Sequence, residues 1–133
     1  MQYQFHTLSN GIRIVHRNSN RLVGHLAVMI NTGSRDELPG EEGLAHFIEH
    51  VIFKGTGKRR VHQVLGRLEN IGADLNAYTT KEETCLHASF LSSHYARAVE
   101  LFADILFNST FPDKEIDKEK DVVIDEINAY KDS

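Results

Sequence analysis

The stretch that most constrains this chain runs from Glu41 to Phe53 and reads E-E-G-L-A-H-F-I-E-H-V-I-F. Its apolar residues recur at helical spacing, so the stretch predicts an amphipathic helix that opens on two acids, Glu41 and Glu42. On such a helix His46 and His50 are four residues apart and lie on the same side. Both imidazoles can therefore reach one metal ion.

A carboxylate completes the pattern His46-x-x-Glu49-His50, which reverses the order of the H-E-x-x-H motif. Two neutral imidazoles can hold zinc while a further position stays open for water, and a nearby carboxylate can accept a proton from that water. The pattern thus favours a hydrolytic zinc site with Glu49 as the general base. The alternative is a helix that carries its histidines on the surface by chance.

The composition is typical of a soluble globular domain, with 133 residues, 41% hydrophobic and 26% charged. A net charge of −4 without a basic block argues against a nucleic-acid partner. The apolar runs are too short to span a bilayer, so no membrane partner is expected. Cys85 is the only cysteine, which fits a reducing compartment, and no signal-peptide pattern follows Met1. We therefore expect a cytoplasmic protein.

The periodicity of the chain predicts an element order of β-β-β-α-α-β-β-α-α. Asn10-Gly11 predicts a hairpin turn between two short strands, and the apolar run 22–30 is typical of a central strand buried on both faces. Further helices are expected at 61–71, 94–108 and 113–131, and further strands at 73–79 and 83–91. This order indicates an α+β fold, with helices packed on a largely antiparallel sheet.

A catalytic zinc site needs a third protein ligand. The last predicted helix offers Glu119 and Glu126, which are seven residues apart and share a face. An acid beside an apolar stripe needs a partner, because an unpaired buried carboxylate is costly. From the residues alone the two acids are equal candidates, and the alternative for both is a solvated helix edge. The other histidines are weaker candidates: His6, His16, His25, His62, His87 and His94.

Four stretches, taken together, resemble one family. They read N-T-G-S-R-D-E at 31–37, G-L-A-H-F-I-E-H-V-I-F-K-G-T at 43–56, L-E-N-I-G-A-D-L-N-A-Y-T-T-K-E at 68–82 and E-K-D-V-V-I-D-E-I at 119–127. In order and spacing they resemble the pitrilysin-type (M16) zinc metallopeptidases, which include insulin-degrading enzyme and the mitochondrial processing peptidase. The likeness is strongest to the processing-peptidase β subunit and to the smaller bacterial members.

The resemblance implies a role for each residue of the site. His46, His50 and Glu126 would bind one zinc ion per chain, and Glu49 would be the general base. Glu119 would steady a ligand histidine from behind, as partners of metal ligands commonly do.

The resemblance also implies where a peptide would bind. Asn76, Ala77 and Tyr78 would lie on an exposed strand edge that pairs with the backbone of a peptide or unfolded polypeptide, a known recognition mode. Phe53 would line a pocket for the residue that follows the cleaved bond. The alternative for Asn76 is a turn residue.

Members of this family are considerably longer than 133 residues. Their second, similarly folded half closes over the zinc site and contributes an Arg/Tyr pair that helps to hold the substrate. We therefore expect residues 1–133 to be the N-terminal zinc-binding domain, with the rest of that domain and the second domain absent. Such a chain would be weakly active or inactive by itself, and its bare surfaces would favour self-association.

Two other functions remain open from the sequence. S-ribosylhomocysteine lyase also uses an H-x-x-E-H helix but takes a cysteine as its third zinc ligand, and Cys85 is the only thiol available for that role. The second alternative is a partner subunit that keeps the peptidase fold without the chemistry. The intact motif at 46–50 and the acid at 126 argue against it.

Overall fold

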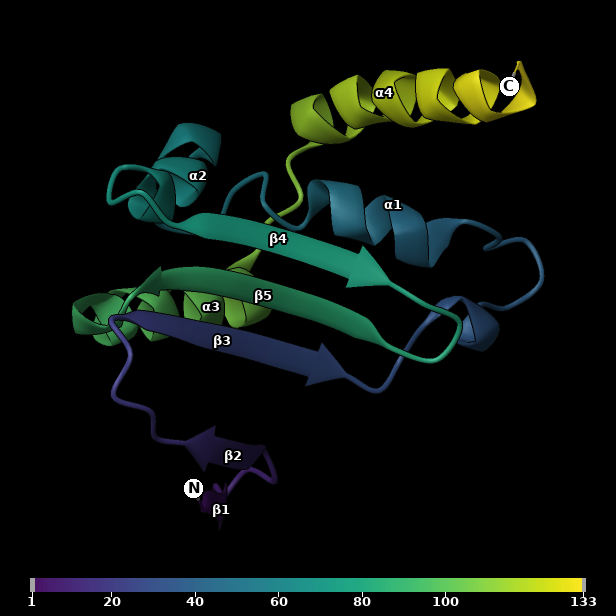
Figure 1. The fold of residues 1–133 in the computed structure, drawn as a ribbon. Coiled ribbons are helices and arrows are strands. Elements are labelled where there is room, and N and C mark those ends of the chain that lie inside the picture. The colour runs from purple at the N-terminus through teal and green to yellow at the C-terminus, as the bar shows by residue number, and fades with distance from the viewer. Residues whose placement is uncertain (1, 133) are drawn as a thin grey trace.

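The computed structural model describes residues 2–132, and its elements follow the predicted order (Figure 1). The strands are β1 (Tyr3–Thr7), β2 (Arg13–Arg17), β3 (Val23–Ile30), β4 (Asp74–Thr79) and β5 (Thr84–Leu91). The helices are α1 (Leu44–Val51), α2 (Val61–Glu69), α3 (Tyr95–Asn108) and α4 (Asp113–Lys131). The prediction of an α+β fold with antiparallel strands is confirmed.

Three strands form the main sheet in the order β3-β5-β4, and both pairs are antiparallel. The prediction that 22–30 is a central strand is wrong, because β3 lies at an edge and most of its residues are exposed. The central strand is β5, whose residues Leu86, Ala88 and Phe90 are buried on one face. An apolar run predicts burial, but strand order depends on which distant segments pair.

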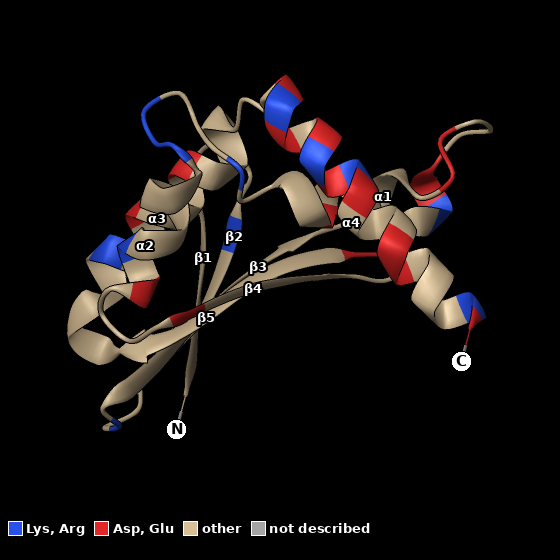
Figure 2. Cartoon of the chain, turned by 90° about the horizontal axis from the view of Figure 1, so that it is seen from above, with Lys and Arg blue, Asp and Glu red and all other residues tan. Residues whose placement is uncertain are grey.

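The core lies between the sheet and the helices α2 and α3. Helix α2 contributes Val64 and Leu68, and α3 contributes Leu101, Phe102 and Ile105 from positions three and four apart. Figure 2 shows α2 and α3 together at one end of the sheet and α1 and α4 together at the other, and each pair is in contact. The sheet, which packs against α2 and α3 at one end, thus supports the contact between α1 and α4 at its other end.

The N-terminal hairpin, β1 with β2, is a separate two-stranded sheet. Gly11 adopts a φ of +92°, a left-handed conformation that favours glycine, and the Asn10 side chain accepts a hydrogen bond from the Ile12 amide. The predicted turn is therefore present. Within residues 2–132, none of the helices is long and apolar enough to cross a membrane.

Candidate metal centre

Helix α1 begins one turn later than the sequence predicts. Gly43 has a φ of +90°, so the helix starts at Leu44 and leaves Glu41 and Glu42 in the preceding turn. The acid that contacts the helix N-terminus is instead Glu37, whose carboxylate accepts a hydrogen bond of 2.8 Å from the Ala45 amide. A carboxylate at this end is favourable because the first amides of a helix lack partners.

One turn of α1 brings its two histidines together. The ring centroids of His46 and His50 are 4.6 Å apart, and their Nε2 atoms are 3.1 Å apart. The His50 side chain is 20% exposed and that of His46 is 42% exposed. Both rings are therefore only partly buried, so an ion can reach them from solvent.

Helix α4 crosses α1 and adds a carboxylate to the pair. One Glu126 oxygen lies 3.2 Å from Nε2 of His50, and the other lies 3.8 Å from Nε2 of His46. The three residues can place one ligand atom each within 4.8 Å of one another, and they are the only such cluster of potential metal ligands among residues 2–132. Glu126 thus meets the two histidines although it lies 80 positions after His46 and 76 after His50 in the sequence.

The second acid of α4 lies behind the pair. Glu119 is buried, and its Oε1 is 3.0 Å from Nδ1 of His50. Because a carboxylate only accepts hydrogen bonds, this contact places a proton on Nδ1, so in the neutral ring Nε2 is the nitrogen that can bind a metal ion. The Lys54 ammonium lies 3.3 Å from the other Glu119 oxygen and balances its charge. No pattern in the sequence indicated this contact of Lys54, because it joins residues of two distant helical segments.

These residues fit zinc by their chemistry. Two imidazole nitrogens and one carboxylate are a donor set that catalytic zinc sites use. A tetrahedral ion with ligands at about 2.0–2.1 Å separates its ligand nitrogens by about 3.3 Å, close to the 3.1 Å between the two Nε2 atoms.

Glu49 lies on α1, between His46 and His50 in the sequence. It is half-buried, and its carboxylate makes no hydrogen bond or ion pair with any residue of the described range 2–132. Its neighbours in the site all have partners. Unlike Glu119 and Glu126, Glu49 thus has no partner within the described residues.

Strand β4 carries the residues expected to meet a peptide. It pairs with β5 on one side, while α1 is in contact with it (Figure 1). Asn76 and Tyr78 are exposed, whereas Ala77 points the other way and packs against the core. Phe53 is also partly buried against the core. The backbone of 76–78 thus lies on an edge strand of the three-stranded sheet, near the histidines.

Cys85 lies apart from the histidine pair. It is buried on β5, opposite Tyr78 of β4, and its sulfur contacts the Leu86 carbonyl at 3.7 Å. It belongs to no potential metal-binding cluster of residues 2–132. The arrangement therefore does not support a site with a cysteine as the third ligand.

The chain is similar to known peptidases over nearly all of its length. The family model described as Insulinase (Peptidase family M16) matches residues 13–133. The zinc protease YmxG of Bacillus subtilis is 43% identical over 130 residues, which make up 96% of this chain and 32% of YmxG. The mitochondrial-processing peptidase subunit β of Rattus norvegicus is 42% identical over 93% of this chain and 25% of its own length.

Solved structures show the same likeness. A protease from Helicobacter pylori has a TM-score of 0.89 at 27% identity and covers 94% of this chain, which matches 30% of that protein. The periplasmic protease PqqL from Escherichia coli has a TM-score of 0.89 at 29% identity, with 98% of this chain matching 16% of that protein. The chain thus spans a third or less of these relatives.

Proposed function

The chain belongs to the insulinase family of peptidases, family M16, and we propose that residues 1–133 are the N-terminal zinc-binding domain of a zinc metalloendopeptidase. The observation that carries the proposal is the convergence of His46, His50 and Glu126 on one point. They bind one zinc ion per chain. Glu119 accepts a hydrogen bond from Nδ1–H of His50 and so orients the imidazole ring. The ion pair with the Lys54 ammonium holds the Glu119 carboxylate in place.

Hydrolysis needs a proton acceptor beside the metal. When bound, zinc would lower the pKa of water and polarise a carbonyl group. Glu49 accepts the proton of the attacking water and passes it to the nitrogen of the leaving amine. The absence of any competing partner for its carboxylate supports this role. The relative YmxG, which is named as a zinc protease, supports the same reaction class.

The substrate is a peptide or an unfolded polypeptide. Its extended backbone pairs with β4 at Asn76, Ala77 and Tyr78, because an edge strand offers unpaired amides and carbonyls. Phe53 lines the pocket for the residue after the cleaved bond. Its partial burial beside α1 leaves part of the ring available for that contact.

The zinc assignment predicts a specific loss of affinity. Glu126→Gln removes a charged ligand atom, so zinc affinity should fall by more than the roughly 10–100-fold that loss of a ligand's hydrogen-bonding partner costs. Competition with a chromogenic chelator measures the affinity. Asp125→Asn is the matched control, because Asp125 is the exposed neighbour on the same helix. A chain in which Cys85→Ser abolishes zinc binding while Glu126→Gln does not would overturn the assignment.

The 133-residue chain should bind zinc but cleave peptides poorly. All three ligands and the base lie within it, whereas holding a peptide in reactive geometry and excluding water requires the second half that we propose for the full-length protein. Misplacement of a substrate by about 1 Å can cost roughly 10²-fold in rate. A quenched fluorescent peptide assay on the zinc-loaded chain and on the full-length protein, with Glu49→Gln as the contamination control, tests this. Equal Glu49-dependent rates would show that the second half is dispensable.

The proposal extends to self-association of the chain and to its cellular location. Large apolar side chains are bare on the surface, including Phe5 at 77% and Leu22 at 80% exposure, so the 133-residue chain self-associates. A cytoplasmic location stays a prediction based on the lone cysteine. Relatives are named both as mitochondrial and as periplasmic proteins.

A further inference from the structure

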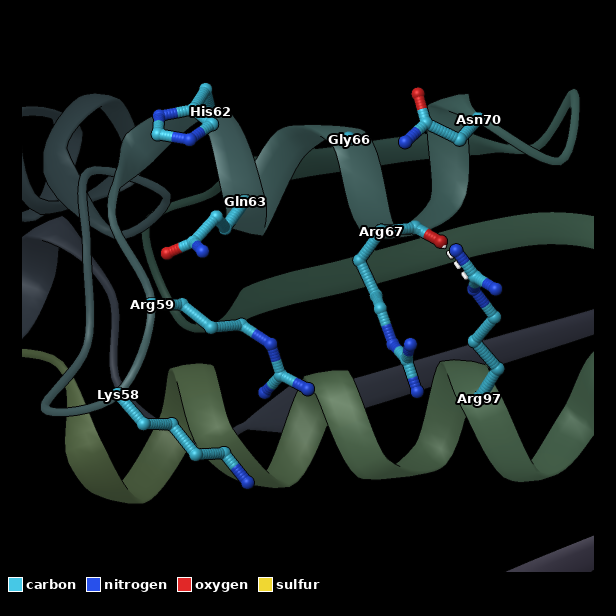
Figure 3. A pocket seen from close by; sticks show the side chains of 8 residues that line it. All are labelled: Lys58, Arg59, His62, Gln63, Gly66, Arg67, Asn70 and Arg97. Carbon is cyan, nitrogen blue, oxygen red and sulfur yellow. Dashed lines mark hydrogen bonds between the residues drawn. The ribbon is translucent and has the colours of Figure 1, made fainter.

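A cavity between α2 and α3 is lined by none of the three proposed metal ligands. It has a volume of about 470 Å³ and is shown in Figure 3. Four of its eight lining residues are cationic, namely Lys58, Arg59, Arg67 and Arg97, and none is acidic. This concentration of positive charge is unusual in a chain whose net charge is −4.

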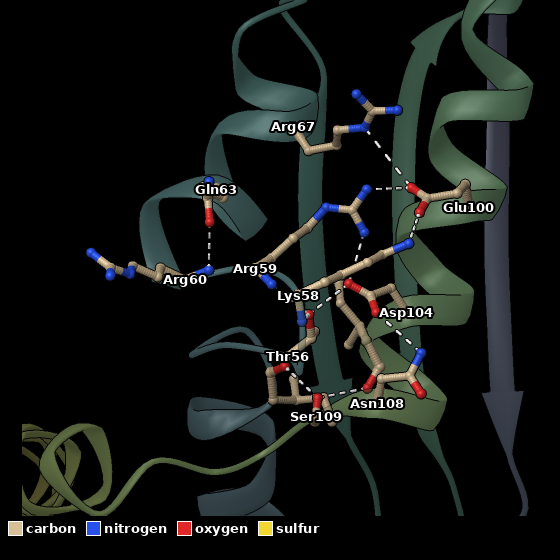
Figure 4. A network of polar contacts seen from close by, with 12 residues as sticks. Thr56, Lys58, Arg59, Arg60, Gln63, Arg67, Glu100, Asp104, Asn108 and Ser109 are labelled. Carbon is tan, nitrogen blue, oxygen red and sulfur yellow. Dashed lines mark hydrogen bonds and ion pairs between the residues drawn. The ribbon is translucent and has the colours of Figure 1, made fainter.

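Two acids of α3 neutralise half of these charges (Figure 4). The Arg59 guanidinium lies 2.6 Å from Glu100 and 2.7 Å from Asp104, and the Lys58 ammonium lies 2.8 Å from Glu100. These contacts hold the loop before α2 against α3. Four cations less two acids leave two positive charges at the cavity.

The remaining charges belong to Arg67 and Arg97. Nε of Arg67 is buried without a hydrogen-bond partner, and its nearest acid, Glu100, is 4.0 Å away. Arg97 donates from its own Nε to the Arg67 carbonyl, an uncharged acceptor (Figure 3). Arg67 has only a long ion pair and Arg97 only a neutral acceptor, so both guanidinium groups keep hydrogen-bonding capacity for an anion in the cavity.

A glycine keeps this cavity open. Gly66 lies inside α2 and lines the cavity, although glycine is less favourable in a helix interior than any residue except proline. Its φ is not positive, so the backbone does not require glycine there. The atoms nearest to a Cβ at this position would belong to the Asn70 amide, the closest of them at 3.3 Å. The missing side chain therefore leaves room that the helix itself does not need.

We propose that this cavity binds a compact phosphate-bearing anion, such as inorganic phosphate, pyrophosphate or the phosphate of a small metabolite. Two guanidinium groups that have no carboxylate closer than 4.0 Å match a dianion better than a monocarboxylate, and their planar forks bind phosphate oxygens bidentately. Gln63 and Asn70 add neutral amide donors at the rim. The volume is within the usual range for small-molecule sites. This site is independent of the zinc site proposed above.

Calorimetric titration of the metal-free protein with pyrophosphate tests the proposal, because without zinc the anion cannot bind through a metal ion. One saturable site per chain is expected. Arg67→Gln and Arg97→Gln should each weaken binding by about 10–100-fold, the usual effect of losing a charged hydrogen bond. Arg60→Gln is the matched control, because Arg60 is exposed next to the cavity but does not line it. Thermal melts of each variant show that it is folded.

Three further measurements test which ligand binds and whether it binds in this cavity. Gly66→Met should block binding while leaving every charge present. Citrate should bind more weakly than pyrophosphate, and comparison of inorganic phosphate with glycerol phosphate shows whether an attached group contributes. Zinc affinity should be unchanged in all of the variants. Absence of saturable binding, equal losses in Arg60→Gln and Arg67→Gln, or tighter binding of citrate would each overturn the assignment.

Discussion

Glu49→Gln in the full-length protein is expected to lower peptide turnover by about 10²–10⁴-fold, the usual contribution of general acid–base catalysis. The amide has nearly the shape of the carboxylate but cannot accept a proton from water. Zinc affinity should stay near that of the unmodified protein, because Glu49 is not among the three converging residues. Steady-state cleavage of a fluorescent peptide, together with zinc content per chain, measures both quantities.

The matched control for this variant is Glu41→Gln, at an exposed acid in the turn before α1. It removes the same charge close to the site without touching the histidines, so turnover should change little. If Glu49→Gln kept zinc and full turnover, Glu49 would have no part in the mechanism. If it lost zinc as well, the carboxylate would be a ligand and the proposed division of roles would be wrong.

Asp104→Ala is expected to lower the free energy of unfolding by about 3–5 kcal/mol, the usual cost of removing one partner of a buried ion pair. Asp104 is 3% exposed and accepts hydrogen bonds from Thr56, Arg59 and Asn108 (Figure 4). Its loss leaves three donors short of an acceptor, although Arg59 keeps Glu100. Urea unfolding of the metal-free chain measures the change.

Asp117→Ala is the matched control for Asp104, because Asp117 is exposed and its Lys120 contact is 3.8 Å long. Little change in stability is expected there, since exposed ion pairs contribute little. Equal effects at the two positions would mean that the network around Asp104 does not hold the loop before α2 to α3.

The same network gives the stability a defined pH dependence. Burial opposes ionisation of Asp104, but hydrogen bonds from Thr56, Arg59 and Asn108 outweigh it and lower the pKa of its carboxyl. A lowered pKa in the folded state stabilises the protein above the unfolded pKa of about 4, and this contribution is lost as the pH falls through the folded pKa. The difference between the unmodified chain and Asp104→Ala should therefore narrow below about pH 4. A constant difference from pH 7 to pH 3 would contradict this cause.

Local patterns in the sequence determined the element order and two of the three proposed metal ligands. His46 and His50 lie together because four residues make about one turn of a helix. The Asn10-Gly11 turn and the strand at 83–91 were predicted for equally local reasons, since they depend on neighbouring residues alone. Where the periodicity was strong, the class of each element was predicted correctly.

Contacts between distant segments were decided only by the tertiary structure. Glu119 and Glu126 share one face of α4, so their spacing could not distinguish them. The crossing of α4 over α1 places Glu126 at Nε2 of both histidines and Glu119 at Nδ1 of His50. In the same way, pairing made β5 the central strand, although 22–30 is the more continuous apolar run. Such choices depend on how packed elements meet, and periodicity within one segment carries no information about the position of its partner.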